Sequence, residues 1–99
     1  MAKLIAELCQ NHNGDLKILD EMISSAASNG ADYAKIQAID SSQLTFRQRF
    51  ESGLSKDGKV KVIKRPYKDE YERLKNLDLS EEIQLNFHAM CKKYNIKPM

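Results

Sequence analysis

The first forty residues alternate between apolar segments and polar turns in a pattern that predicts a strand, a helix and a second strand. Residues 3–8 form a short apolar run interrupted by Glu7, which fits a buried strand, although periodicity alone does not exclude a helical segment. Residues 32–39 give a second strand candidate. Between them, apolar side chains recur at helical spacing at Leu16, Leu19, Met22, Ile23, Ala26 and Ala27. Asp15 suits the start of this helix, and Asn29-Gly30 suits its end.

The second half of the chain shows a long segment without helical periodicity, followed by a second amphipathic helix. Residues 40–69 carry no sustained apolar stripe, but residues 58–63 alternate with period two, which favours a small hairpin arm. Residues 69–77 fit a short helix. Ser80 is a good N-cap. After it, apolar residues again follow helical spacing at Ile83, Phe87, Met90, Cys91 and Tyr94.

This order predicts a parallel βαβ unit, which is almost always right-handed. Parallel strands are buried on both faces and belong to sheets of several strands, so two strands alone would be marginal. The chain has 99 residues, whereas a complete (β/α)₈ barrel needs about 250. Residues 96–99 lie where a third strand should begin. We therefore expect residues 1–99 to form one partial domain, the opening of a larger α/β fold, either truncated before its third strand or completed by another chain.

Composition indicates an ordinary globular protein. Hydrophobic residues make up 41% and charged residues 30%, and the formal net charge is +2. Two cysteines cannot form the disulfide framework of a small secreted domain. The sequence contains no apolar run long enough to span a membrane and no evident signal peptide. We expect a cytoplasmic protein with reduced thiols.

Basic residues are concentrated in the second half of the predicted loop 40–69. Residues 56–68 contain six Lys or Arg and one Asp. Such a run is most often a solvated face, but it can also form a basic lip that attracts an anionic ligand. Nucleic acid is the less favoured partner, because the overall charge is small and aromatic residues are not interleaved with the basic ones.

Polar residues that could bind a ligand or take part in catalysis lie near the carboxyl ends of the two predicted strands. Parallel α/β folds bind their ligands at these ends. Glu7 lies near the end of the first strand, and Lys35 and Gln37 lie near the end of the second. A carboxylate and a lysine within apolar strands are costly unless they are paired or face a polar cavity. Two interpretations remain open: a Glu7–Lys35 ion pair that neutralises itself, or a site in which the lysine binds an anion and the carboxylate acts in acid–base chemistry.

The turn after the first strand adds Asn11 and His12 to this end of the predicted sheet. A single histidine in a turn is more often structural than a ligand. His88 falls outside the apolar stripe of the second helix, which indicates a surface position. The histidines and cysteines lack zinc-ligand spacing, so the chain by itself shows no metal site.

The residues resemble the N-acetylneuraminate (sialic acid) synthase family. The segment Ile5–Asp15, which reads IAELCQNHNGD, is similar to the strand and turn with which that family opens. Residues 30–37, GADYAKIQ, resemble its helix end and second strand. Residues 71–82 are similar to the family's segment before the second barrel helix. The resemblance covers nearly the whole chain and implies a βαβα portion of a TIM (β/α)₈ barrel, with residues 40–69 as the long loop between its second strand and second helix.

The resemblance implies condensation of phosphoenolpyruvate with an N-acylated mannosamine-type sugar and release of phosphate. By motif position, Glu7 would contact the acceptor sugar and Lys35 the phosphoenolpyruvate, as the catalytic pair. Asn11, His12 and Gln37 would complete the substrate-binding face. The family uses a divalent metal, Mn²⁺ or Mg²⁺, whose ligands come from later strands and are not in this chain. We expect a homodimer for the full-length enzyme.

Two departures from the family pattern accompany this resemblance. Cys9 stands where the family usually has Gly, which predicts a bulkier strand end, and Ala38-Ile39 replaces a common Thr-Phe pair. A quarter of a barrel cannot hold both reactants in near-attack geometry, so the isolated chain is predicted to be inactive. The alternative is a small non-enzymatic or self-assembling βαβα protein that retains the motif.

Overall fold

A computed structural model describes residues 2–99 and divides them into two compact units. The first comprises the chain up to Ile39 together with Leu77–Met99, and the second comprises Asp40–Asn76. The first unit contains the parallel sheet and the two long helices. The second contains two short helices, one 3₁₀ turn and a hairpin.

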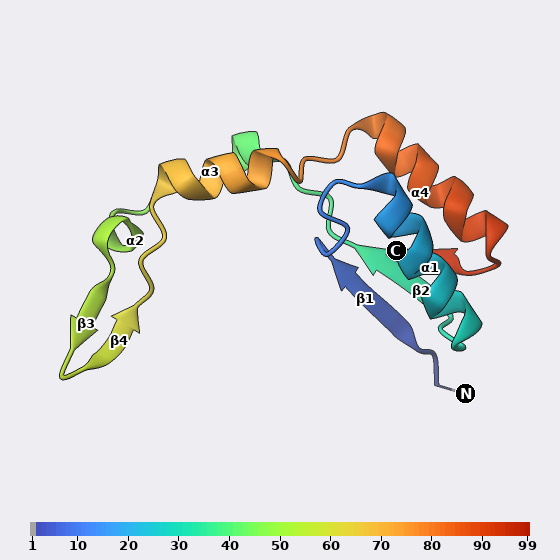
Figure 1. Cartoon of the computed structure of the whole chain (residues 1–99), viewed down its shortest axis with the longest axis horizontal. Helices are drawn as coiled ribbons and strands as arrows, with labels where there is room; N and C mark the ends of the chain where they lie inside the picture. The colour runs from blue at the N-terminus through green and yellow to red at the C-terminus, as the bar shows by residue number, and fades with distance from the viewer. Residues whose placement is uncertain (1) are drawn as a thin grey trace. The chain divides into compact units, whose positions relative to one another are not determined.

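The first unit is a three-stranded parallel sheet packed against two helices (Figure 1). Its strands are β1 (Ile5–Cys9), β2 (Tyr33–Ile36) and β5 (Lys97–Pro98), in the order β1-β2-β5. The helices are α1 (Leu16–Ser28) and α4 (Glu81–Lys93). Both predicted strands, both predicted helices and their parallel connection are therefore confirmed.

The third strand corrects the predicted boundary. The sequence indicated that the chain ends before this strand, but Lys97–Pro98 already pair with β2, and Met99 N–H donates to the Ala34 carbonyl at 2.9 Å. The return is possible because Asn95 turns the chain with a φ of +55° and Ile96, only 5% exposed, packs into the core.

The core lies between the sheet and its helices. Its buried members are Leu8, Leu19, Ile23, Ala34, Phe87, Cys91 and Ile96. Leu8 and Ala34 belong to β1 and β2, and side chains alternate along a strand. Glu7 and Lys35 therefore point to the other face of the sheet, away from the helices. The alternation along β1 and β2 thus determines which strand side chains are buried in the core and which can contact a ligand.

Local capping signals define the helix starts as the sequence predicted. The Asp15 carboxylate accepts from Lys17 N at 2.8 Å and caps α1, and the Ser80 hydroxyl accepts from Ile83 N at 3.2 Å and caps α4. Among the described residues, no helix is both long and apolar enough to cross a membrane.

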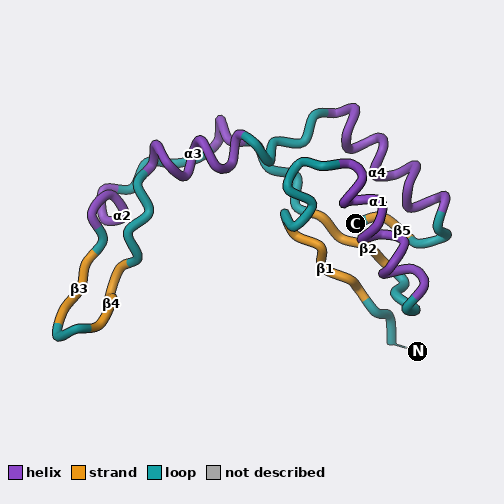
Figure 2. The backbone as a smooth tube through the Cα atoms, viewed as in Figure 1, coloured by secondary structure: helices purple, strands orange, loops and turns teal. Residues whose placement is uncertain are grey.

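The second unit contains the predicted hairpin and short helix (Figure 2). The hairpin pairs β3 (Leu54–Lys56) with β4 (Lys59–Val62), and the helix α3 spans Tyr67–Lys75. The turn residues Asp57 and Gly58 both have positive φ, as a two-residue type I′ hairpin turn requires. A 3₁₀ turn η1 (Ser41–Gln43) and a five-residue helix α2 (Gln48–Ser52) were not expected.

The ends of the second unit leave and re-enter the first unit at neighbouring positions. Ile39, which follows β2, forms an isolated parallel bridge with Asp78, which precedes α4. Leu77 and Leu79 are buried on either side of Asp78. The two residues of the first unit between which the second unit is inserted are therefore neighbours.

Candidate functional site

The carboxyl ends of β1 and β2 bring Glu7 and Lys35 together. The two residues are direct partners in the parallel register, and Lys35 Nζ lies 3.1 Å from Glu7 Oε2. The Lys35 side chain is 45% exposed and that of Glu7 is 38% exposed. The pair thus lies on an accessible face, where either group can also contact a ligand.

Glu7 is held in its ionised form. Its Oε1 atom accepts a hydrogen bond from Cys9 N at 2.9 Å, while Oε2 faces Lys35. The hydrogen bond with Lys35, followed by that from Cys9 N–H, lowers the pKa of Glu7 below its usual value. Glu7 is therefore suited to accept hydrogen bonds from hydroxyl groups.

Cys9 ends β1 in an unusual conformation. Its φ is +50°, and the strand pairing shifts register between Glu7 and Cys9. This left-handed conformation suits glycine, the residue that the resembling family usually has at this position. The neighbouring Glu7 carboxylate raises the pKa of the Cys9 thiol, which therefore stays protonated and is not a reactive thiolate.

The turn after β1 places Asn11 and His12 in different environments. Asn11 is exposed, whereas His12 is only 1% exposed. Gly14 N donates to His12 Nδ1 at 2.9 Å, so the imidazole proton lies on Nε2, which has no hydrogen-bond partner among the described residues. Asn11 is thus available to a ligand, while the His12 ring supports the turn.

Gln37 joins the site through Gln10, a residue that the sequence did not single out. Gln10 Nε2 donates to Gln37 Oε1 at 3.1 Å, and Gln37 N donates to the Cys9 carbonyl at 3.2 Å. The amide pair connects the ends of β1 and β2. The signal that could have identified Gln10 is its place close after the end of the predicted first strand.

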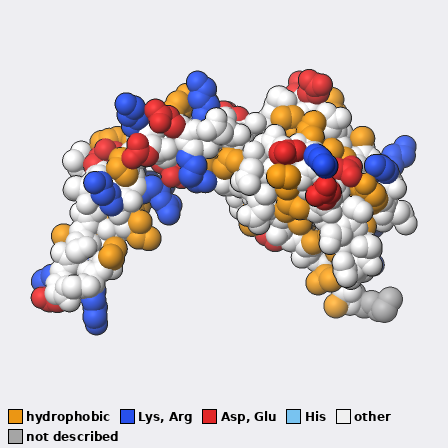
Figure 3. Space-filling view, viewed as in Figure 1, with side chains coloured by type: hydrophobic (Ala, Val, Ile, Leu, Met, Phe, Trp, Pro, Cys, Tyr) orange, Lys and Arg blue, Asp and Glu red, His pale blue; other side chains and the backbone are white. Residues whose placement is uncertain are grey.

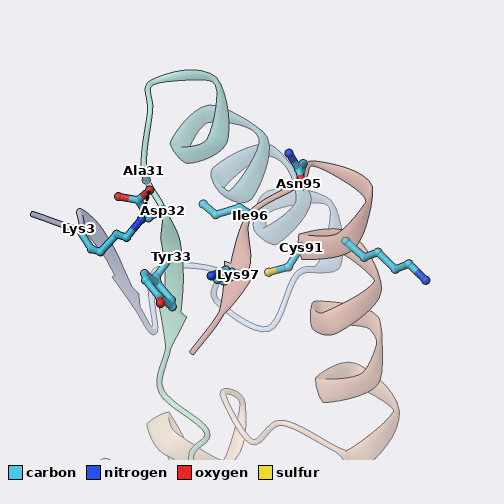
Figure 4. Close-up of a pocket in the computed structure, with 9 residues that line it drawn as sticks. Lys3, Ala31, Asp32, Tyr33, Cys91, Asn95, Ile96 and Lys97 are labelled. Atoms are coloured by element: carbon cyan, nitrogen blue, oxygen red, sulfur yellow. Dashed lines mark ion pairs between the residues drawn. The ribbon is translucent and has the colours of Figure 1, made fainter. Parts of the chain in front are cut away.

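A cavity at the opposite ends of the strands forms the main alternative site. It has a volume of about 350 Å³ and lies among Lys3, Asp32, Tyr33, Asn95 and Lys97 together with the start of β5 and the end of α4 (Figure 4). Asp32 is engaged there, since its carboxylate accepts from Leu4 N at 2.8 Å and lies 4.0 Å from Lys3 Nζ. Ligands of parallel α/β folds bind at the carboxyl ends, so Glu7 and Lys35 form the better candidate.

Comparison with known proteins identifies the family. A family model described as the NeuB family matches residues 22–99. The chain belongs to the NeuB family. The match includes Lys35 and Gln37 and begins after Glu7 and the following turn. It confirms the resemblance drawn from the motifs.

A curated relative supports this assignment. The chain is 34% identical over 79 residues to the N,N'-diacetyllegionaminic acid synthase of Legionella pneumophila subsp. pneumophila. The alignment covers 80% of this chain and 21% of the relative. The chain therefore spans about a fifth of the length of this synthase.

The described part of this NeuB chain offers no group of three or more His, Cys, Asp or Glu residues that could hold a metal ion. The histidine of the turn after β1, His12, is buried. These residues do not fit the divalent metal that the family resemblance implies.

Acidification is expected to destabilise the folded chain through His12. Burial lowers the pKa of His12 below the ordinary value near 6.5, so the unfolded chain binds the proton more tightly. The stabilising contribution is complete above about pH 6.5 and is lost as the pH falls through the lower pKa of the folded state. Urea unfolding midpoints between about pH 7.5 and about pH 5 measure this loss.

The variant His12→Gln should flatten this pH dependence. His88 provides the matched control, because it is exposed on α4, and His88→Gln should keep the wild-type dependence. An unchanged slope in His12→Gln would show that other groups cause the acid sensitivity.

Proposed function

We propose that this chain supplies part of the active site of a nonulosonic acid synthase, which condenses phosphoenolpyruvate with an N-acylated mannosamine-type sugar. The observation that carries the proposal is the accessible Glu7–Lys35 pair, located at the carboxyl ends of parallel strands in a NeuB chain. The relative's name supports a sugar-acid synthase as the class. The fold proposed for the whole protein is a TIM barrel, in which β1, β2 and β5 are consecutive strands.

The proposed reaction forms one carbon–carbon bond and releases phosphate. C3 of phosphoenolpyruvate attacks the aldehyde carbon of the open-chain sugar, and water attacks C2. The resulting tetrahedral intermediate expels inorganic phosphate and leaves the carboxylate and keto group of the nonulosonic acid. Every atom of the products comes from the two substrates and the water.

The residues of this chain bind and orient the substrates in this scheme. Lys35 is a compact cation with three donors and binds the anionic phosphoenolpyruvate. Glu7, held ionised by its neighbours, accepts hydrogen bonds from hydroxyl groups of the acceptor sugar. The amides of Asn11 and Gln37, both exposed, complete the substrate-binding face in this proposal. An anion bound by Lys35 competes with Glu7 for the lysine ammonium. Substrate binding therefore weakens the Glu7–Lys35 ion pair and replaces it with contacts to the substrate.

A chimaeric enzyme tests the proposal. In it, this chain replaces the segment of the Legionella synthase that it matches. The chimaera should release phosphate from phosphoenolpyruvate when supplied with an N-acylated mannosamine-type sugar. The isolated chain should release none, because it cannot hold both reactants in near-attack geometry. Phosphate release by the isolated chain, or a folded but inactive chimaera, would contradict the proposal.

A further inference from the structure

The second unit contains an aromatic ring flanked by guanidinium groups. The Cζ atom of Arg49 lies 4.7 Å from the centroid of the Phe50 ring, and that of Arg47 lies 5.4 Å from it. Phe50 is half-buried on α2, and its carbonyl accepts from Arg65 N at 2.7 Å. The ring and this backbone bond hold two arginines and the segment after β4 in one place.

A cavity opens beside this ring. Its volume is about 450 Å³, within the range of small-molecule sites. Six residues line it: Arg49, Phe50, Lys61, Val62, Ile63 and Arg65. Three of the six are cations and three are apolar, and no carboxylate contributes to the lining. Figure 3 shows basic side chains exposed over this unit.

The cations of this Phe50 cavity keep their charge available. Among residues 2–99, Arg49, Lys61 and Arg65 form no ion pair with a carboxylate within 4.0 Å. The nearby acids have other partners: Glu51 accepts from Tyr67 N at 2.8 Å, and Glu70 pairs with Arg73 at 2.5 Å. The charge of Arg65 also lowers the pKa of Glu70, but less than the hydrogen bond with Arg73 does. The cavity is therefore a locally cationic pocket.

The backbone around the cavity is fixed by a close approach. Gly53 has a φ of +68°, and a Cβ atom there would lie 2.8 Å from both Lys64 N and Val62 O. Because no side chain fits, the start of β3 packs directly against the exit of β4. This contact holds Lys61, Val62 and Arg65 beside α2.

We propose that the Phe50 cavity binds the phosphate groups of a phosphorylated small molecule, independently of the Glu7–Lys35 site. Guanidinium groups bind phosphate oxygens through paired, charge-assisted hydrogen bonds, and Lys61 adds a third cation. Phe50, Val62 and Ile63 give the cavity an apolar wall, on which a planar or apolar part of the ligand lies. The site goes beyond the proposed condensation, because its lining residues all belong to the second unit and none of them has a role in that reaction as proposed.

Isothermal titration of the 99-residue chain with inorganic pyrophosphate and with ADP tests this site. Pyrophosphate probes the cations alone, and ADP adds a planar group for the apolar wall. We expect both to bind, ADP more tightly. The double variant Arg49→Gln, Arg65→Gln should weaken both by about tenfold or more, because it removes the guanidinium donors.

The hairpin tip provides a control with the same loss of charge. Lys56 and Lys59 are exposed beside the Asp57-Gly58 turn and do not line the cavity. The double variant Lys56→Gln, Lys59→Gln should change the affinity less than about twofold. Circular dichroism of both variants shows whether the fold is retained, and Lys61→Gln in an intact background is the second test if the arginine variant unfolds.

Three results would overturn the proposal. One is equal weakening by the cavity and tip variants, which would indicate general electrostatic attraction. Another is no detectable binding of either probe to the folded chain. The third is tighter binding of a single-stranded oligonucleotide than of ADP with equal sensitivity to both double variants, which would indicate a nucleic-acid surface.

Discussion

Replacing Phe87 by Ala is expected to lower the free energy of unfolding by about 3–5 kcal/mol. Phe87 is 4% exposed on α4 and packs into the core that α1, α4 and the sheet share. Truncation removes its buried apolar surface and leaves a cavity that the surrounding elements fill only in part. In a core of this size, that loss is a large fraction of the total stability of a small domain.

Urea unfolding followed by circular dichroism measures this effect. Leu85 on the same helix is the matched control, because it is 64% exposed. Leu85→Ala should change the free energy of unfolding by less than about 0.5 kcal/mol. Equal destabilisation by the two variants would mean that α4 does not pack as the structure places it.

Replacing Lys35 by Met in the chimaeric synthase is expected to lower kcat/KM for phosphoenolpyruvate by about 10²–10³-fold. Methionine keeps an unbranched side chain but removes the charge and its donors. The loss follows from the proposed role of Lys35 as the cation that binds the anionic substrate. Glu7 would also lose its principal partner, the interaction that does most to lower its pKa.

Initial rates of phosphate release over a range of phosphoenolpyruvate concentrations measure this effect. Lys3→Met is the control, because Lys3 is a 59% exposed lysine before β1, outside the carboxyl-end site. It should leave kcat/KM within about twofold of the parent value. Unchanged kinetics in Lys35→Met would mean that Lys35 is only a structural partner of Glu7.

Much of the sheet and helix arrangement could be predicted because its signals are local. Apolar spacing located α1 and α4, the side chains of Asp15 and Ser80 marked their starts, and the alternation after Gly58 located the hairpin. The strand ends could also be predicted to adjoin, since parallel strands joined by one helix place their carboxyl ends together. The Glu7–Lys35 contact follows directly from that rule.

Other features depend on contacts that local sequence does not encode. The burial of His12 results from how its turn folds back, and an NHNG segment reads as polar and exposed. The register shift at Cys9 and the Gln10–Gln37 hydrogen bond arise from the pairing of two strands distant in sequence. The sequence placed the start of a third strand within residues 96–99, but two residues give too short a pattern to predict that Lys97–Pro98 already pair with β2. The buried Ile96 fixes their position. The roles assigned to Glu7, Asn11, His12, Lys35 and Gln37 stay predictions.

The bridge between Ile39 and Asp78 has a consequence for how this chain can evolve. It holds the two ends of the Asp40–Asn76 segment next to each other. For the parallel sheet, that segment is therefore a loop whose ends are already joined. Each doubling of a loop's length costs only about 0.6 kcal/mol in closure entropy. Insertions, deletions or a new hairpin can therefore accumulate between the second and third strands while the strand register that pairs Glu7 with Lys35 is inherited unchanged.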